Sequence, residues 1–226
     1  MVADCNGRYI LSGWLSGYGW GYVLQHRELV QKENGIIGMK WLPELTPNTD
    51  ELNLHCSIED LNNPTEIALK RKKSYYLECS VLPDKDGKVG IAFNGEGDPF
   101  VFSLDSKKEK VQTNYSDGMA QFPDEIESLC EYATKLSEPL ESFRKLEKNI
   151  YHHKSHNFSI IKVDELKTKY KLCMMIHYEA KSDSIIIDAQ IAEGRTFISN
   201  RPFFNADSIT VFAENARIQN LKIFEM

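Results

Sequence analysis

The sequence lacks a hydrophobic run of the length that a transmembrane helix needs, and its first residues lack the basic-then-apolar profile of a signal peptide. No membrane association is therefore predicted, and the compartment is left open. Positive charge is also scarce: the formal net charge is -6, and the one basic run, 70–73, is short. Such a chain has no broad positive field to gather phosphates, so nucleic acid is not an expected partner.

Cysteine pairs and catalytic signatures are missing as well. The five cysteines are odd in number and include no Cys-x-x-Cys pair, which predicts neither a zinc site nor a disulfide framework. No Gly-x-Ser-x-Gly, Walker loop or His-Glu-x-x-His occurs. His152, His153 and His156 could hold a metal if the backbone brought them together, but a loop after a helix favours solvated histidines. We therefore predict no metal site and no cofactor.

What the sequence has is a pattern of short strands. Ten Tyr and eleven Phe suit pleated, half-buried surfaces. Leu52, Leu54, Cys56 and Ile58 alternate with polar residues, as in a strand with one buried face. Many short strands at regular spacing indicate a sandwich or a barrel. The further strands are expected at 64–69, 73–82, 88–94, 99–104, 109–113, 157–163, 170–179, 184–191, 195–200, 208–213 and 217–225.

The first 45 residues form glycine-punctuated strand pieces. Asn34-Gly35 is a strong hairpin signal between two apolar pairs. Trp14, Tyr18 and Trp20 alternate with glycines in the segment 13–21. These aromatic rings could stack on a sugar or fill a core, and without further context the core is favoured.

One segment departs from the strand pattern. After Pro123, apolar residues recur at intervals of three and four up to Ile150, which predicts an amphipathic helix or two short ones. Its apolar stripe is most simply a face packed on the sandwich. The alternative is a seam for dimerisation or for a partner protein.

Several motifs resemble glycoside hydrolase family 32, the invertase and levanase family. The segment 7–15, GRYILSGWL, is similar to the family's "GRRILxGW" strand in the last blade of a five-bladed propeller. Residues 26–29, HREL, resemble "PRELxL", and 41–45, WLPEL, resemble the "P-x-x-E-L" tail that leads into a C-terminal sandwich. Towards the C-terminus, 184–201 resembles "SVVEVFxNDGRTVLTSR", 209–216 resembles "ISLFAEGG", and 221–226 resembles "SLxVWEL".

The resemblance implies the C-terminal region of such a protein. The implied fold is mostly all-β: an antiparallel two-sheet sandwich of the concanavalin-like or jelly-roll type. Residues 1–45 would be last-blade strands, and 50–226 a sandwich with a helical insertion at about 123–150. The strands of an isolated blade would leave edges unpaired, so we expect 1–45 to pair with the sandwich, a second copy or a partner chain.

Catalysis is not expected. The family uses two carboxylates in a retaining mechanism, and its motifs "NDPNG" and "RDP" are absent here. Glu78-Cys79 superficially echoes the family's "ECP", but Ser80 replaces the proline and the position follows the Gly-Trp strand instead of preceding it. Glu78 is better interpreted as a sandwich residue that faces solvent or a paired base.

The function predicted from these observations is that of a non-catalytic sandwich module. It would support a catalytic propeller domain and could bind fructan or another oligosaccharide. The candidate ligand-binding residues are Glu78, Asp188, Arg201, Trp14, Tyr18 and Trp20. For Glu78, Asp188 and Arg201, structural ion pairs or exposed strand charges are an equally good interpretation. A hydrolase with an unrecognised site also stays open. The family resemblance implies export.

Overall fold

The computed structural model describes residues 2–17, 19–31, 35, 37–95, 99–115, 159–162, 166, 168–180, 183–192, 196–200 and 205–226. The predicted helix at 123–150, the three histidines at 152–156, Tyr18 and Arg201 lie outside these residues. In the part that is described, no helix is long and apolar enough to cross a membrane.

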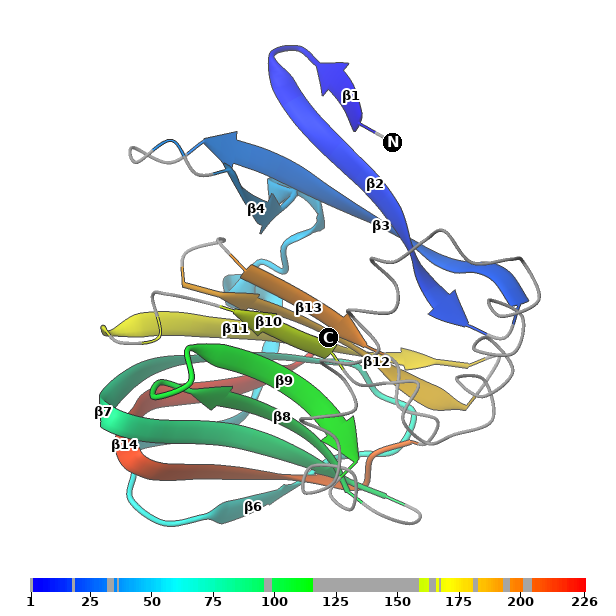
Figure 1. Cartoon of the computed structure of the whole chain (residues 1–226). Helices are drawn as coiled ribbons and strands as arrows, with labels where there is room; N and C mark the ends of the chain where they lie inside the picture. Colours follow the sequence, from blue (N-terminus) through cyan, green and yellow to red (C-terminus); the bar gives the residue numbers. More distant parts are fainter. Residues whose placement is uncertain are drawn as a thin grey trace, which may run out of the picture.

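The N-terminal residues form a four-stranded antiparallel sheet, which we call the N-terminal sheet (Figure 1). Its strands lie in chain order: β1 (Val2–Cys5), β2 (Arg8–Gly17), β3 (Gly19–Gln31) and β4 (Ile37–Trp41). β3 and β4 pair antiparallel, as the predicted hairpin between them requires, and Gly35 has a φ of 80°, a value that suits glycine. Two short 3₁₀ helices, η1 (Pro43–Leu45) and η2 (Thr49–Glu51), lead from this sheet to the rest of the chain.

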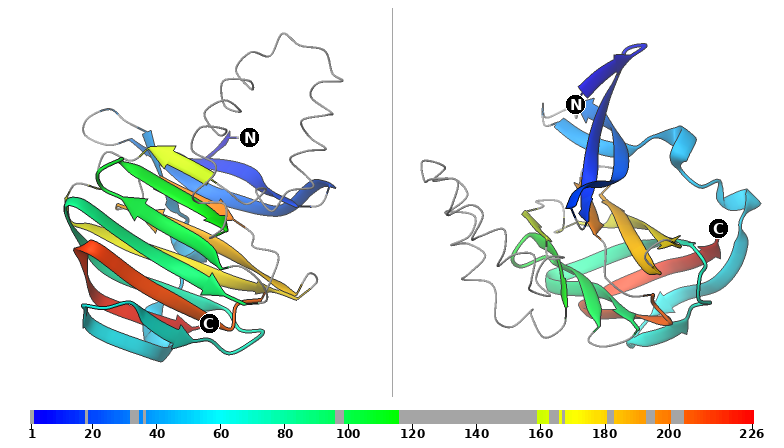
Figure 2. Two further views of the ribbon diagram at one scale, coloured as in Figure 1. Left: turned by 60° about the horizontal axis from the view of Figure 1, so that its bottom comes forward. Right: turned by 90° about the vertical axis from the view of Figure 1, so that its right-hand side faces the viewer.

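The remaining strands form a sandwich of two antiparallel layers (Figures 1 and 2). The first layer has the order β13-β12-β11-β7-β14-β5, and the second has the order β10-β9-β8-β7-β14-β6. The strands are β5 (Asn53–Leu61), β6 (Thr65–Ala68), β7 (Tyr75–Asn94), β8 (Phe100–Asp105), β9 (Lys110–Tyr115), β10 (Ser159–Lys162), β11 (Tyr170–Glu179), β12 (Ser184–Ile191), β13 (Thr196–Asn200) and β14 (Ser208–Glu225).

Two long strands, β7 and β14, belong to both layers. They pair with each other along almost their whole length, with register shifts at 214–216 and 219–222. The bend in β7 lies near Gly87, where an added Cβ would come within 2.6 Å of the carbonyl oxygen of Asn215. Asn215 itself has a φ of 49°. Only glycine fits at Gly87, because the two bent strands approach each other so closely there.

This pairing corrects one expectation. The segments 73–82 and 88–94 were predicted as separate strands joined by a turn at 84–87, and 208–213 and 217–225 as another separate pair. Each pair is one continuous strand. The breaker residues bend the strand from one layer into the other without reversing the chain, because the ladder between β7 and β14 continues through the bend.

The core between the layers is apolar and comes from both of them. Leu77, Leu172 and Ile187 of the first layer join Phe93 and Phe102 of the second in one buried cluster. These residues alternate with outward-facing ones along each strand, as the sequence pattern predicts. The predicted two-sheet sandwich of all-β class is thus confirmed.

Candidate functional site

The N-terminal sheet packs on the outer face of the first layer. Trp41, at the end of β4, is 5% exposed and lies in a cluster with Tyr76, Cys173, Met175 and Phe224 of the sandwich. The ring centroids of Trp41 and Tyr76 are 6.3 Å apart, as are those of Tyr76 and Phe224. Burial raises the pKa of the Tyr76 hydroxyl, which therefore stays neutral at physiological pH. A small apolar core thus joins the two sheets.

A buried ion pair lies beside this cluster. The Arg27 guanidinium, from β3, donates to Oδ2 of Asp188, on β12, at 2.5 Å. The two side chains are only 10% and 8% exposed. The indole Nε1–H of Trp41 donates to the same oxygen at 3.2 Å, and the Trp41 backbone N–H donates to Gln190 at 3.1 Å. Asp188, a predicted ligand-binding residue, is therefore a buried anchor point for two residues of the N-terminal sheet.

Glu78 lies on the same outer face, in the adjacent row of side chains. Glu78 faces Cys173 on the neighbouring strand β11 and Lys222 on the neighbouring strand β14. Lys171 donates to its carboxylate at 2.7 Å, with side-chain exposures of 53% for Lys171 and 20% for Glu78. Although partial burial opposes it, this hydrogen bond raises the pKa of Lys171. Glu78 thus remains accessible, and its carboxylate is already held by a cation.

The aromatic candidates lie on the N-terminal sheet. Trp14 lies on β2 and Trp20 lies on β3. For these two residues the structure describes the backbone alone. Glu78 and Asp188 therefore share one face of the sandwich, while Trp14 and Trp20 belong to a different sheet. The ligand-binding role of these residues stays a prediction.

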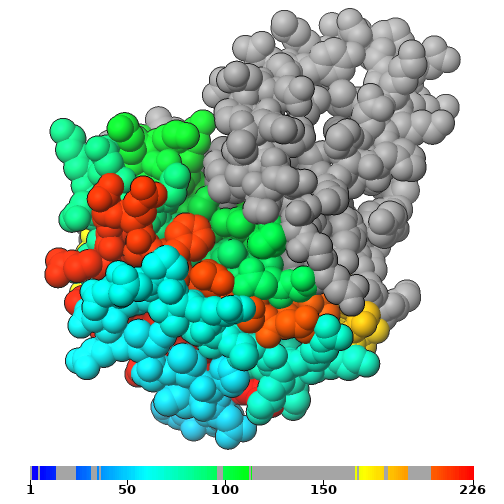
Figure 3. All heavy atoms as spheres, turned by 90° about the horizontal axis from the view of Figure 1, so that it is seen from below, coloured from blue at the N-terminus to red at the C-terminus, as the bar shows by residue number. Residues whose placement is uncertain are grey.

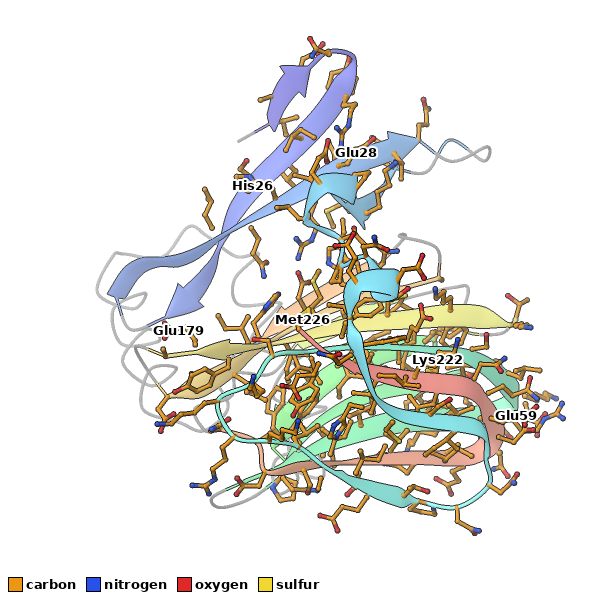
Figure 4. All side chains as sticks on the ribbon, turned by 180° about the vertical axis from the view of Figure 1, so that it is seen from behind. His26, Glu28, Glu59, Glu179, Lys222 and Met226 are labelled. Atoms are coloured by element: carbon orange, nitrogen blue, oxygen red, sulfur yellow. The ribbon has the colours of Figure 1, made fainter. Side chains whose placement is uncertain are left out.

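Sequence reasoning missed Arg27 and Trp41, although both lie in segments that carry the family resemblance. The three N-terminal motifs also meet in space, on the side of the N-terminal sheet that faces away from the sandwich. Arg8 of the first motif binds Glu28 of the second at 2.9 Å and Glu44 of the third at 2.5 Å. Figure 4 places Glu28 on the N-terminal sheet, well apart from Lys222 on the sandwich.

The pKa values of Arg8, Glu28 and Glu44 are shifted so that all three groups stay charged. The hydrogen bond from Arg8 lowers the pKa of Glu44 to about 2, and hydrogen bonds to Glu44 and Glu28 raise the pKa of Arg8. All three groups keep their charges across the physiological range. The motif residues therefore hold η1 against the sheet.

A hydrogen bond joins Ser12 and His26 on the same side of the sheet, with 2.8 Å between Oγ and Nδ1. The two residues face each other across β2 and β3. Among the residues that the structure describes, no group of three or more His, Cys, Asp or Glu side chains is placed to hold a metal ion.

Comparison with known proteins adds a likeness of fold. No protein-family model and no curated protein matches the sequence. A GH32 beta-fructofuranosidase of Bombyx mori matches with a TM-score of 0.59 at 15% identity, over 100% of this chain and 39% of that one. A sucrose-6-phosphate hydrolase of Lactobacillus gasseri matches with a TM-score of 0.57 at 14% identity, over 98% of this chain and 39% of that one.

The chain thus spans 39% of the length of these two enzymes. At such low identity the likeness establishes the fold alone. It bears out the resemblance found in the motifs: the chain folds like a C-terminal GH32-like β-sandwich region.

Proposed function

We propose that this chain is a non-catalytic β-sandwich module that supports a catalytic propeller domain and contacts a fructan or a related oligosaccharide. The observation that carries the proposal is the attachment of the N-terminal sheet to the sandwich. The Arg27–Asp188 pair and the Trp41 cluster fix that sheet on the outer face of the first layer. A sheet held in this way is a rigid platform for further β structure.

The ion pair serves orientation more than stability. Two charges taken out of water gain little net free energy, because desolvation offsets their attraction. Arg27 also donates to the carbonyl oxygen of His26, and Trp41 shares the Asp188 carboxylate. A guanidinium held by several directed hydrogen bonds accepts only a narrow range of geometries. The angle between the N-terminal sheet and the sandwich is therefore specified.

The N-terminal sheet has surface to offer a partner. In the described residues, β1 pairs only with β2, and β4 pairs only with β3. Val2, Tyr9 and Ile37 are 53%, 55% and 67% exposed, and the ladder places them on the same side of the sheet as Leu29 and Trp41. Sheet edges and apolar faces of this kind invite association with another sheet.

The arrangement of the carboxylates supports a non-catalytic role. Retaining glycosidases need two carboxyl groups about 5–5.5 Å apart that flank the glycosidic bond. Here Asp188 is buried against Arg27, and Glu78 is held by Lys171. Each of these two carboxylates is therefore engaged by a cation of the protein itself, which favours a structural role.

The proposal is tested by incubating the purified protein with levan, inulin and sucrose and measuring released reducing sugar. We expect no release above a buffer blank. Sustained release that Asp188→Asn or Glu78→Gln abolishes would show a hydrolase instead. The fructan contact is tested separately by calorimetric titration with levan- and inulin-derived oligosaccharides, because a protein can bind a sugar without cleaving it.

A further inference from the structure

The outer face of the second layer carries a group of residues that the proposed function leaves unassigned. They come from three neighbouring strands, β6, β14 and β7, and Figure 3 shows that segment of β14 in orange between cyan and green strands. We infer that this face is the carbohydrate-binding surface of the module, with Phe212 as its stacking platform. The inference rests on the proposed sugar contact and assigns it to a site.

The Phe212 ring lies flat on the sheet. Phe212 faces Gly90 across the β14–β7 ladder. A Cβ added to Gly90 would meet the Cζ end of the ring: Cζ is the nearest atom, and Cε1 and Cε2 follow at 2.6 Å and 2.7 Å. Because both Cε atoms are nearly equidistant and only slightly farther than Cζ, the missing Cβ lies above the ring plane. The Cζ end of one ring face therefore covers Gly90. The other face points away from the sheet, and Phe212 is partly exposed.

A glycine inside a strand, as Gly90 is, lowers the stability of the sheet, so its presence here calls for a reason. Glycine inside a strand weakens the strand and often marks a close approach of another group. Here the absence of a side chain on Gly90 lets the Phe212 ring lie down instead of standing upright. A ring parallel to the sheet presents a flat apolar surface, which is what the apolar face of a sugar ring packs against.

Next to the ring is a chain of hydrogen bonds with a defined direction. Nδ2 of Asn94 donates to the Ser208 hydroxyl at 3.1 Å and to the Thr210 hydroxyl at 3.0 Å. The Ser208 hydroxyl in turn donates to Oε1 of Glu66 at 2.5 Å. The Asn94 amide and the Glu66 carboxylate therefore fix the roles of both hydroxyls.

The two ends of this series of hydrogen bonds can donate to and accept from the hydroxyl groups of a sugar. Thr210 accepts from Asn94 and keeps its own proton for donation, whereas Glu66 is exposed and keeps acceptor capacity on its second oxygen. Thr210 and Glu66 are direct neighbours across β14 and β6. A donor beside an acceptor suits a pair of adjacent sugar hydroxyls, each of which both donates and accepts.

The spacing is also suitable. Phe212 and Thr210 are two residues apart on one strand, so their side chains emerge on the same face about 7 Å apart. Ser208 lies one row further along. The platform and the polar groups thus extend over a length of two or three rows. The Glu66 carboxylate disfavours anionic ligands, so the ligand class is a neutral oligosaccharide.

The experiment is calorimetric titration of the full chain and of three variants with inulin- and levan-derived oligosaccharides, up to roughly 10 mM. Phe212→Ala removes the platform, and Thr210→Val removes one hydroxyl with little change of shape. Lys222→Ala is the matched control: Lys222 is exposed on the outer face of the other layer, and no binding role is assigned to it. Thermal melts of every variant confirm that each one folds.

We expect saturable binding by the unsubstituted chain, weakened about tenfold or more by Phe212→Ala and about threefold to tenfold by Thr210→Val. Lys222→Ala should bind as the unsubstituted chain does. Binding that both second-layer variants retain, or that only Lys222→Ala loses, would overturn the assignment to this face and leave the proposed sugar contact standing. An absence of heat with every oligosaccharide would overturn both.

Discussion

The N-terminal sheet and the sandwich are both antiparallel β structure, but they are stabilised differently. Each layer of the sandwich buries one face against the other layer, and the two share one continuous apolar cluster. The N-terminal sheet touches the sandwich through a much smaller cluster around Trp41 and one buried ion pair. The sandwich should therefore stay folded without the N-terminal sheet, whereas the sheet depends on the sandwich for its position.

The largest expected effect is in the core of the sandwich. Phe102 is fully buried among side chains of both layers. Phe102→Ala should lower the free energy of unfolding by about 3–5 kcal/mol, because it leaves a cavity as well as losing apolar contact. Leu45→Ala is the control, since Leu45 is 57% exposed and its loss should cost under about 0.5 kcal/mol. Urea denaturation followed by circular dichroism measures the free energy of unfolding of both variants. Equal losses in the two would contradict the view that the shared apolar core stabilises the sandwich.

A second prediction concerns the attachment of the N-terminal sheet. Asp188→Ala leaves the Arg27 guanidinium buried without its carboxylate, and removing one partner of such a pair costs up to about 3–5 kcal/mol. We expect a smaller loss, because the N-terminal sheet can swing away and hydrate Arg27. In a chain whose Trp14 and Trp20 are both replaced by Phe, tryptophan fluorescence should then report exposure of Trp41 at urea concentrations that leave the circular dichroism of the sandwich unchanged.

The matched control replaces both charges together, as Arg27→Met with Asp188→Leu. This double variant should recover most of the lost attachment, since apolar residues of similar volume often substitute for a buried pair without loss. A double variant that is as weakly attached as Asp188→Ala would show that the ion pair does more than orient the sheet.

The third prediction concerns Gly90 on the second layer. Gly90→Ala places a methyl group where the Phe212 ring lies, so the ring must lift. Overpacking of this kind should cost about 1–2 kcal/mol. In a chain that already carries Phe212→Ala the same change should be nearly neutral, because the obstacle is gone. Chemical denaturation of the four chains of this double-mutant cycle measures the coupling, and purely additive effects would contradict the flat-ring geometry.

The smallest effect concerns an exposed ion cluster at the end of β14. Hydrogen bonds from Lys70 and Lys73, at 2.7 and 2.9 Å, lower the pKa of Glu225 from 4.5 to about 2. Because the folded-state pKa is depressed, the stabilisation is present above pH 4.5 and is lost as the pH falls from 4.5 to about 2. Side-chain NMR titration should find the Glu225 pKa near 2 and find it raised when both lysines are replaced by alanine. An unchanged value in that variant would rule out the lysines as the cause.

Much of the fold could be predicted from the sequence, because the residue pattern that produces a strand or a turn lies within that segment itself. The alternation of apolar and polar residues along 52–58 predicts β5, and an Asn-Gly pair predicts the β3–β4 hairpin. The bends in β7 and β14 could not be predicted, because a bend and a chain reversal use the same breaker residues. Only the partner strand decides between them, and that partner lies more than one hundred residues away in sequence.

The candidate site was predicted less completely, for a similar reason. Asp188 and Glu78 were singled out as polar groups able to take paired sugar hydroxyls, but their partners within the protein were not. Arg27 is 161 residues away from Asp188 in sequence, and Lys171 is 93 residues away from Glu78. In the sequence, Phe212 takes part in the same alternation of residues as any other position of a strand. Its flat orientation depends on Gly90, and only the pairing of β14 with β7 brings the two residues together.

Hydrogen–deuterium exchange of the intact chain, measured along β3 and β4, tests whether the N-terminal sheet is anchored. We expect slow exchange at residues 25–31 and 37–41, because the sheet is held on the sandwich. Asp188→Ala should speed exchange there and leave β11 and β12 protected. Rapid exchange throughout 7–42 in the unsubstituted chain would contradict the anchored platform, and with it the proposed support of a partner domain.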